Sequence, residues 1–111
     1  MAVDPTFQFP YFGGTIALTT HSSPVRLITL ILALAPHVPE ACTFLRINAQ
    51  TGNASPVFFG GDTVSDTNYA YSLAAEAEKE YESATSVQGV PLGRIWIWCE
   101  ADANLGIEVI A

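Results

Sequence analysis

Short apolar runs alternate with turn-forming residues along most of this chain, and the clearest pattern lies in residues 42–49. There, Leu45 and Ile47 alternate with the polar residues Arg46 and Asn48. Because successive side chains of a β-strand point to opposite faces, this alternation predicts a strand with one face in a core and the other in water. Residues 50–53 form a turn signal that leads to an apolar run at 56–59. We expect the two runs to form a β-hairpin, since glycine and asparagine tolerate the positive φ of hairpin turns.

Three further strands are expected at residues 15–20, 94–99 and 106–110, next to turn-forming residues. In residues 94–99 the isoleucines alternate with Trp96 and Trp98, so both faces of this strand are apolar. An apolar second face indicates a surface that is covered by something beyond the strand's own core.

Two segments are ambiguous. Residues 25–34 are almost entirely apolar, which fits either a central strand or a short buried helix. We favour a strand there, because prolines bound the run closely. Residues 73–84 are rich in helix-forming residues, but their apolar positions do not make a clean helical stripe. We therefore expect a charged edge strand at 77–83, where charge discourages edge-to-edge pairing.

About seven or eight short strands with frequent turns predict an all-β fold, an antiparallel β-sandwich or barrel of jelly-roll-like type. The chain of 111 residues has the length of one domain, which we place at residues 14–111. Residues 1–13 combine two prolines with several aromatic residues, and we expect them to form an extended N-terminal arm. The arm either lies on its own domain or embraces another subunit.

The composition points to contact with other proteins. Half of the residues are hydrophobic and only 14% are charged, so part of the apolar surface is expected to be covered by protein. The net charge is −7, and the few scattered cations argue against binding to nucleic acid or to an anionic membrane surface. The most apolar run has about nine residues, whereas a membrane-spanning helix needs about twenty. The N-terminus has no signal-peptide pattern, so we expect synthesis in the cytoplasm. In that reducing compartment, Cys42 and Cys99 are expected to be buried, reduced thiols and not a disulfide.

The residue patterns predict no catalytic residue, no metal and no cofactor. His21 and His37 stand in separate turns without metal-ligand spacing, the serines lack a nucleophile elbow, and the glycines fit no phosphate-binding loop. Oxygen ligands for calcium are present at Asp62, Asp66 and Asn68, but polar loop tips often look like this. The alternating carboxylates Glu76, Glu78, Glu80 and Glu82 would share one face of a strand, which we interpret as a solvated acidic face rather than a catalytic pair.

Residues 42–110 also carry a series of short motifs. These are Arg46-Ile47-Asn48, Gly52-Asn53, Val57-Phe58-Phe59-Gly60-Gly61, Val64-Ser65, Thr67-Asn68-Tyr69-Ala70-Tyr71-Ser72-Leu73 and the run from Leu92 to Trp98. The series resembles a pattern in small structural proteins of tailed bacteriophages, a group similar to capsid decoration (cement) proteins and to head-fibre or tail-associated modules. The departure lies at residues 75–82, where the pattern has a Gly-Glu turn into a strand and this chain has Ala-Glu-Ala-Glu-Lys-Glu.

This resemblance implies a non-enzymatic virion protein, made in the host cytoplasm, that decorates or cements the capsid by binding the major capsid protein or other virion proteins. It also implies a homo-oligomer, for instance a trimer. Because aromatic side chains dominate interface energetics, we expect intersubunit contacts at Phe7, Phe9, Tyr11, Phe12, Trp96 and Trp98. Ordinary core packing is the competing interpretation of the two tryptophans.

The principal alternative is a carbohydrate- or host-surface-binding β-sandwich module of a head fibre or tail. Its ligand loop would consist of Asp62, Asp66, Asn68, Tyr69 and Tyr71, with aromatic faces stacking on sugar rings. A cupin-like enzyme is a third reading, but it would need a cluster of metal-ligating histidines that the two separate histidines do not supply.

Overall fold

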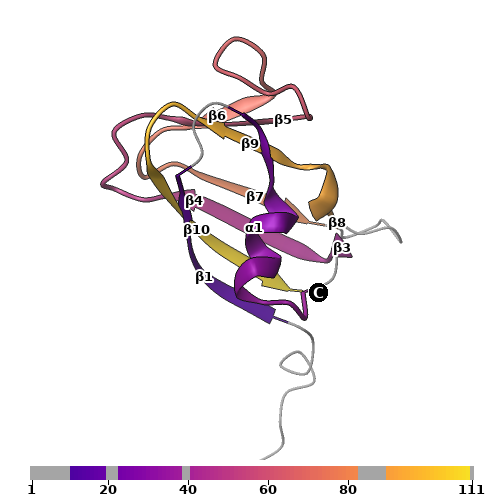
Figure 1. The fold of residues 1–111 in the computed structure, drawn as a ribbon. Coiled ribbons are helices and arrows are strands. Elements are labelled where there is room, and N and C mark those ends of the chain that lie inside the picture. The colour runs from indigo at the N-terminus through magenta and orange to yellow at the C-terminus, as the bar shows by residue number, and fades with distance from the viewer. Residues whose placement is uncertain (1–10, 20–22, 39–40, 83–89, 111) are drawn as a thin grey trace, which may run out of the picture.

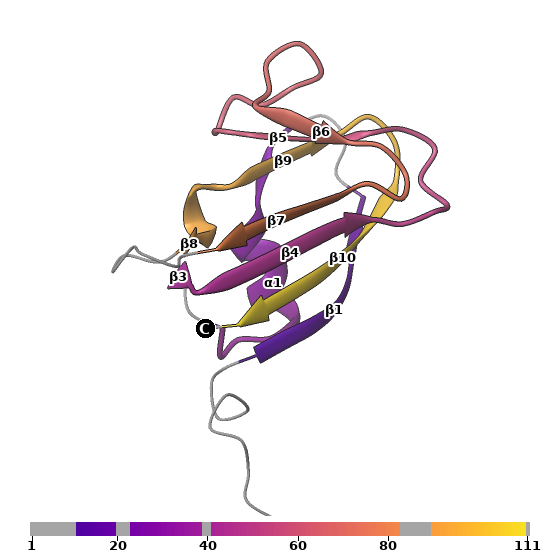
Figure 2. The same cartoon turned by 180° about the vertical axis from the view of Figure 1, so that it is seen from behind.

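The computed structural model describes residues 11–19, 23–38, 41–82 and 90–110, and most of them lie in two antiparallel sheets (Figures 1 and 2). The long sheet has the order β1 (Tyr11–Leu18), β10 (Ala103–Ile110), β4 (Phe44–Ala49) and β7 (Glu78–Glu82). The short sheet has the order β2 (Val25–Arg26), β9 (Trp96–Cys99), β5 (Val57–Gly60) and β6 (Tyr71–Leu73). The remaining elements are α1 (Leu27–Leu34), the 3₁₀ turn η2 (Leu92–Arg94) and the strand pair β3 (Ala41–Cys42) and β8 (Val90–Pro91).

The predicted antiparallel, mostly-β fold is therefore confirmed. Every strand pair in both sheets runs antiparallel. In the long sheet Ile107 lies opposite Ile47, and Val109 lies opposite Leu45, all on the face that is buried. The alternation expected in residues 42–49 holds residue by residue along β4, whose burial alternates from Phe44 to Ala49.

Both sheets and the helix enclose one hydrophobic core. The long sheet contributes residues such as Leu45 and Leu105, and the short sheet contributes Phe59 and Ile97. Helix α1 lies on the inner side of the long sheet (Figures 1 and 2), where Leu27, Ile28 and Ile31 join the same core. Among the described residues no polar or charged residue is classed as buried, so hydrophobic burial dominates this core.

The prediction of a strand at residues 25–34 is wrong beyond its first two residues. Val25 and Arg26 form β2, and the chain then turns into α1. The buried helix residues Leu27, Ile28 and Ile31 recur at the 3.6-residue period of a helix, while the opposite side of α1 is exposed. Thr29 is the only polar residue of α1, and it lies on this exposed side together with apolar Leu32 and Leu34, so the sequence has too few polar positions to reveal the helical period.

The expected hairpin between residues 42–49 and 56–59 is also wrong. Strand β4 pairs with β10 and β7, whereas β5 pairs with β6 and β9 in the other sheet. The turn at residues 50–53 does form, with the Asn53 N–H donating to the Gln50 carbonyl. Its side chain then anchors the turn to a distant loop, because the Asn53 amide donates to the Asn104 carbonyl and accepts from the Asn104 N–H. The connection therefore crosses from one sheet to the other.

The remaining expectations are met in part, and the strand expected at 94–99 forms only at Trp96–Cys99, because Arg94 belongs to η2. A charged edge strand was expected at 77–83, and β7 (Glu78–Glu82) forms the edge of the long sheet. The last strand is longer than predicted, and the strand expected at 15–20 begins at Tyr11. Residues 11–13 thus belong to β1 and not to an arm, while residues 1–10 lie outside the described part of the chain. The helix considered for residues 73–84 does not form among residues 73–82.

Candidate binding surface

The outer face of the short sheet carries a group of partly exposed aromatic side chains. Along β9 the inward residues Ile97 and Cys99 are buried, so Trp96 and Trp98 point outward and are half-buried. Phe58 of β5 lies directly opposite Trp98, with ring centroids 5.8 Å apart. Tyr69 covers Phe58 edge to face at 4.9 Å and remains 48% exposed. We call Phe58, Tyr69, Trp96 and Trp98 the aromatic surface.

The loop after β5 is held by its own hydrogen bonds. Ser65 and Asn68 form an isolated antiparallel bridge, and the Asn68 side-chain amide donates to both the carbonyl and the hydroxyl of Thr63 at 3.2 and 3.0 Å. Asp62 and Asp66 are exposed. Within the described ranges no group of three or more His, Cys, Asp or Glu side chains is placed to hold a metal ion. The loop therefore positions Tyr69 at the edge of the aromatic surface, and Asn68 supports the loop itself.

Tyr71 is separated from the other residues of the predicted ligand loop. Its ring stacks on Phe59 of the inner face at 4.9 Å, and its hydroxyl contacts the Tyr81 hydroxyl of β7. The Lys79 ammonium lies 5.1 Å from the centre of the Tyr71 ring. Burial raises the pKa of the Tyr71 phenol, and the Tyr81 hydroxyl raises it further. Tyr71 thus joins the two sheets instead of facing a ligand.

The predicted interface residues fall into three groups. Trp96 and Trp98 belong to the aromatic surface. Phe12 is half-buried against the core of its own chain, so this residue lies on its own domain. Phe7 and Phe9 lie outside the described residues, and Tyr11 is placed only as the first residue of β1.

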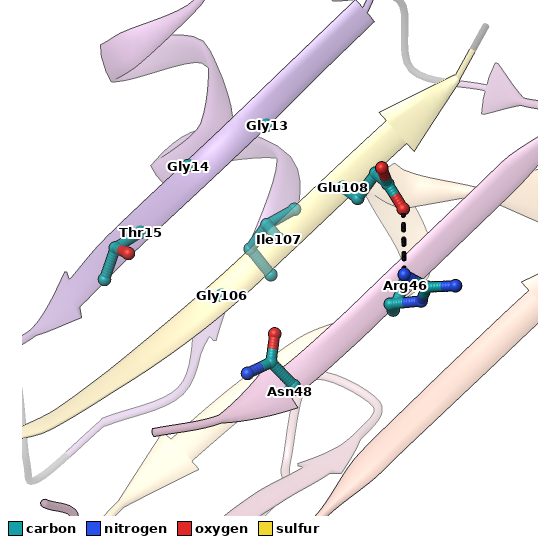
Figure 3. Close-up of a pocket in the computed structure, with 8 residues that line it drawn as sticks. All are labelled: Gly13, Gly14, Thr15, Arg46, Asn48, Gly106, Ile107 and Glu108. Atoms are coloured by element: carbon teal, nitrogen blue, oxygen red, sulfur yellow. Dashed lines mark ion pairs between the residues drawn. The ribbon is translucent and has the colours of Figure 1, made fainter. Parts of the chain in front are cut away.

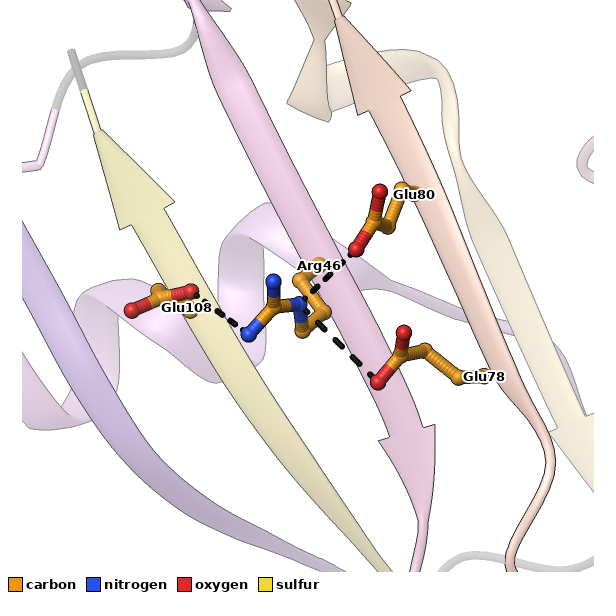
Figure 4. Close-up of polar contacts among 4 residues, drawn as sticks. All are labelled: Arg46, Glu78, Glu80 and Glu108. Carbon is orange, nitrogen blue, oxygen red and sulfur yellow. Dashed lines mark hydrogen bonds and ion pairs between the residues drawn. The ribbon is translucent and has the colours of Figure 1, made fainter.

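A second, polar surface lies on the outer face of the long sheet, where Arg46 stands among three carboxylates (Figure 4). Its Nε is 3.1 Å from Glu80 and 3.9 Å from Glu78, and its Nη1 is 3.3 Å from Glu108. The hydrogen bond to Glu80 and the surrounding carboxylates raise the pKa of Arg46. The predicted acidic face forms on β7 (Glu78–Glu82), whereas Glu76 lies in the turn before that strand, and β4 places a cation within the face.

Beside Arg46 the same face contains a shallow depression of about 330 Å³ (Figure 3). It is lined by Gly13, Gly14, Thr15, Arg46, Asn48, Gly106, Ile107 and Glu108. Its floor is low because glycines of β1 and β10 carry no side chains. The guanidinium beside it is already paired with carboxylates, so the depression is not arranged as a site for an anion.

Cys42 and Cys99 are both buried and form no disulfide with each other, as predicted. Burial raises the pKa of the Cys42 thiol to about 11, although a backbone hydrogen bond at Phe44 opposes part of this effect. Burial also raises the pKa of Cys99. Both thiols are therefore protonated at neutral pH, and neither has the low pKa of a reactive cysteine.

Sequence reasoning identified both tryptophans and Tyr69 but missed Phe58, which connects Tyr69 to Trp98. Phe58 stands between buried Val57 and Phe59, so alternation alone predicts that it faces outward. Its contact with Trp98 depends on the pairing of β5 with β9, which no local pattern reveals. The Arg46 cluster was missed for the same reason, since its members come from three strands.

No helix in the described part of the chain is long and apolar enough to cross a membrane. Comparison with models of protein families, with curated proteins and with solved structures finds no match to this chain.

Proposed function

We propose that this protein is a non-enzymatic structural protein of a tailed-phage virion, a jelly-roll-like β-sandwich that decorates the capsid and binds the major capsid shell through the aromatic surface. The observation that carries the proposal is the aromatic surface itself. Tyr69 is 48% exposed, and it packs on Phe58 next to half-buried Trp98. The motif series in residues 42–110 and the low charge of the chain support the same function.

An aromatic group of this kind is suited to a protein partner. Trp and Tyr are enriched among residues that dominate binding energy, because large flat rings lose much water-exposed area at a small cost in side-chain entropy. The rings at this site already support one another through contacts at 4.9 and 5.8 Å. Their arrangement is thus largely set before a partner arrives, which reduces the cost of ordering on binding.

The test uses particles of the encoding phage that lack this protein. Purified wild-type chain should co-sediment with them, and the double variant Tyr69→Ser/Trp98→Ser should bind at least roughly tenfold more weakly, as expected for loss of two aromatic anchors. Leu34→Ala is the matched control, because Leu34 is 58% exposed on α1 and its loss removes apolar area elsewhere. A double variant that folds and binds like wild type would contradict the assignment of the surface.

The N-terminal segment extends the proposal. Phe7 and Phe9 are assigned to contact with a neighbouring subunit or the shell, and β1 begins only at Tyr11. A chain lacking residues 2–10 keeps all of β1 and should retain its circular dichroism spectrum while binding particles more weakly. Unchanged particle binding would remove the segment from the interface.

A glycan-binding module is the second candidate, and one observation favours it. Tyr69 presents an exposed ring beside the polar loop that carries Asp62 and Asp66, as sugar-binding sites often combine an aromatic face with polar groups. A glycan-array screen with and without calcium distinguishes the two candidates. Glycan binding that is lost in Tyr69→Ser, together with no binding to particles, would replace the capsid proposal.

A further inference from the structure

The two edges of the long sheet differ in charge. At one edge, every residue of β7 except Tyr81 is charged. At the other edge, β1 has eight residues and none of them is charged. Within the described residues β1 pairs only with β10, so one side of its backbone has no strand beside it (Figures 1 and 2).

An unpaired edge strand presents a row of backbone N–H and C=O groups to any other strand. Natural proteins discourage such pairing with charged side chains, prolines, bulges or very short edges. Strand β7 has the charges, but β1 has none of these features over Tyr11–Leu18 and pairs with β10 residue by residue without a bulge. The β1 edge is therefore the edge of this sheet that is suited to adding a strand.

The side chains of β1 also allow a close approach. Gly13, Gly14, Thr15 and Ala17 are all exposed and all small. The glycines form part of the depression in Figure 3. Glycine within a strand often marks a place where another backbone comes near. Nothing bulky on these residues stands in the way of a second strand.

We propose that the occupant of this edge is the β1 strand of a second copy of the chain, paired antiparallel to the first. A twofold axis perpendicular to β1 relates the two strands, so that the long sheets of both copies become one continuous sheet. This arrangement closes on itself as a dimer, as isologous interfaces do. Pairing β1 of one copy with β7 of another would instead be head-to-tail and would propagate as a filament, against a charged edge.

The charge distribution makes the β1 edge, and not the β7 edge, the place where a second copy meets the least repulsion. Each chain carries a net charge of −7, so two copies repel one another in general. The β1 seam brings together two strands without any charged side chain. The aromatic surface lies on the other sheet, so this dimer does not depend on the proposed function and leaves that surface available.

The first experiment measures the mass of the full chain in solution by sedimentation and native mass spectrometry. Wild type should give twice the chain mass of 11.9 kDa. Thr15→Lys places a charge at the seam in both copies and should raise the dimer dissociation constant at least roughly tenfold. Thr51→Lys makes the same change at an exposed turn and should leave the dimer intact. A wild-type monomer, a trimer or an open polymer would overturn the proposal, as would equal effects of the two variants.

A crosslinking experiment covers the case in which Thr15→Lys fails to fold. Single cysteines are placed at Gly13, Thr15 and Ala17 of β1, and at Thr51 as the control. Native Cys42 and Cys99 are buried and do not compete. Under mild oxidation at least one β1 cysteine should form a covalent dimer in high yield, because residues near the twofold axis face their own copies. A covalent dimer from the Thr51 cysteine alone, or none from β1, would overturn the proposal.

Discussion

At the scale of single residues, the backbone restricts which side chain is tolerated at two positions, Gly106 and Glu76. Gly106 of β10 lies opposite Asn48 of β4 on the outer face. A Cβ atom on Gly106 would lie 2.3 Å from Asn48 Oδ1 and 2.9 Å from Gln50 Nε2. The second position is Glu76, whose φ of 72° is unusual for a residue with a side chain.

We expect Gly106→Ala to lower the free energy of unfolding by about 1–2 kcal/mol, because Asn48 must move away from the new methyl group. The loss should be smaller in an Asn48→Ala background, where the obstructing oxygen is gone. Urea unfolding of both single variants and the double variant measures this coupling. Equal losses in the two backgrounds would show that Asn48 does not constrain this position.

Glu76 stands in the turn between β6 and β7, where its N–H donates to the Ala49 carbonyl at 2.9 Å. Glycine adopts positive φ without strain, whereas a β-branched residue does not. We therefore expect Glu76→Gly to stay within about 1 kcal/mol of wild type and Glu76→Val to lose about 1–2 kcal/mol in unfolding free energy. Glu82→Val on the extended, exposed part of β7 is the control and should be tolerated. Equal losses for Val and Gly at position 76 would contradict the backbone explanation.

At the scale of elements, three neighbouring strands bring Arg46 together with Glu78, Glu80 and Glu108. Strand β7 carries its carboxylates on the outer face, as alternation predicted, and β10 adds another from the other side. The arginine offsets repulsion among these groups, and its charged side chain is solvent-exposed, so salt screens the effect.

We expect Arg46→Gln to lower the midpoint of thermal unfolding at low ionic strength, and the loss should shrink as salt is added. Adding Glu108→Gln should recover part of the loss, because one of the repelling carboxylates is then neutral. Arg94→Gln on η2 makes the same change in net charge and should lower the midpoint of thermal unfolding by less than Arg46→Gln does. Thermal melts at several salt concentrations test this expectation. A loss that does not depend on salt would assign the effect to packing of the arginine stem instead.

At the scale of the whole molecule, Tyr71 and Tyr81 join the two sheets through their hydroxyl groups. Tyr71 belongs to β6 of the short sheet and Tyr81 to β7 of the long sheet. Burial raises the pKa of both phenols above the ordinary value of 10.0. The folded protein thus holds both groups neutral at a pH where an unfolded chain would ionise them.

This difference predicts a loss of stability in alkaline solution. The contribution is fully present below the unfolded pKa of about 10 and falls as pH rises above it, because the unfolded chain then releases protons that the native state retains. Cys42, with a pKa raised from 9.0 to about 11, acts in the same direction from a slightly lower pH. Urea unfolding near neutral pH and about one unit above pH 10 should show a smaller decline for Tyr71→Phe/Tyr81→Phe than for wild type. Equal declines would exclude this tyrosine pair as the cause.

Much of the fold follows from local pattern. The alternation around Leu45 and Ile47 identified β4 and its buried face, and the charges of residues 77–83 identified β7 as an edge. Burial of Cys42 and Cys99 also follows from the apolar runs around them. These features were predictable because each depends on the side chains of one strand and on which of its two faces meets water.

The features that were missed depend on partners far along the chain. Residues 27–34 form a helix because the inner side of this segment packs on the core, while its outer side carries only one polar residue, Thr29, which is too little to show the helical period. The turn at residues 50–53 connects two sheets, and Asn53 ties it to Asn104, a distant partner that the sequence of the turn does not reveal.

The sequence by itself determined which positions are apolar, where turns interrupt the strands and which edge is charged, since these are properties of neighbouring residues. Only the tertiary structure decided which strands pair, and so brought Phe58 to Trp98, Arg46 to its carboxylates and Tyr71 to Tyr81. The physical reason is that strand pairing is settled by burial and hydrogen bonding across the whole molecule, to which every segment contributes at once.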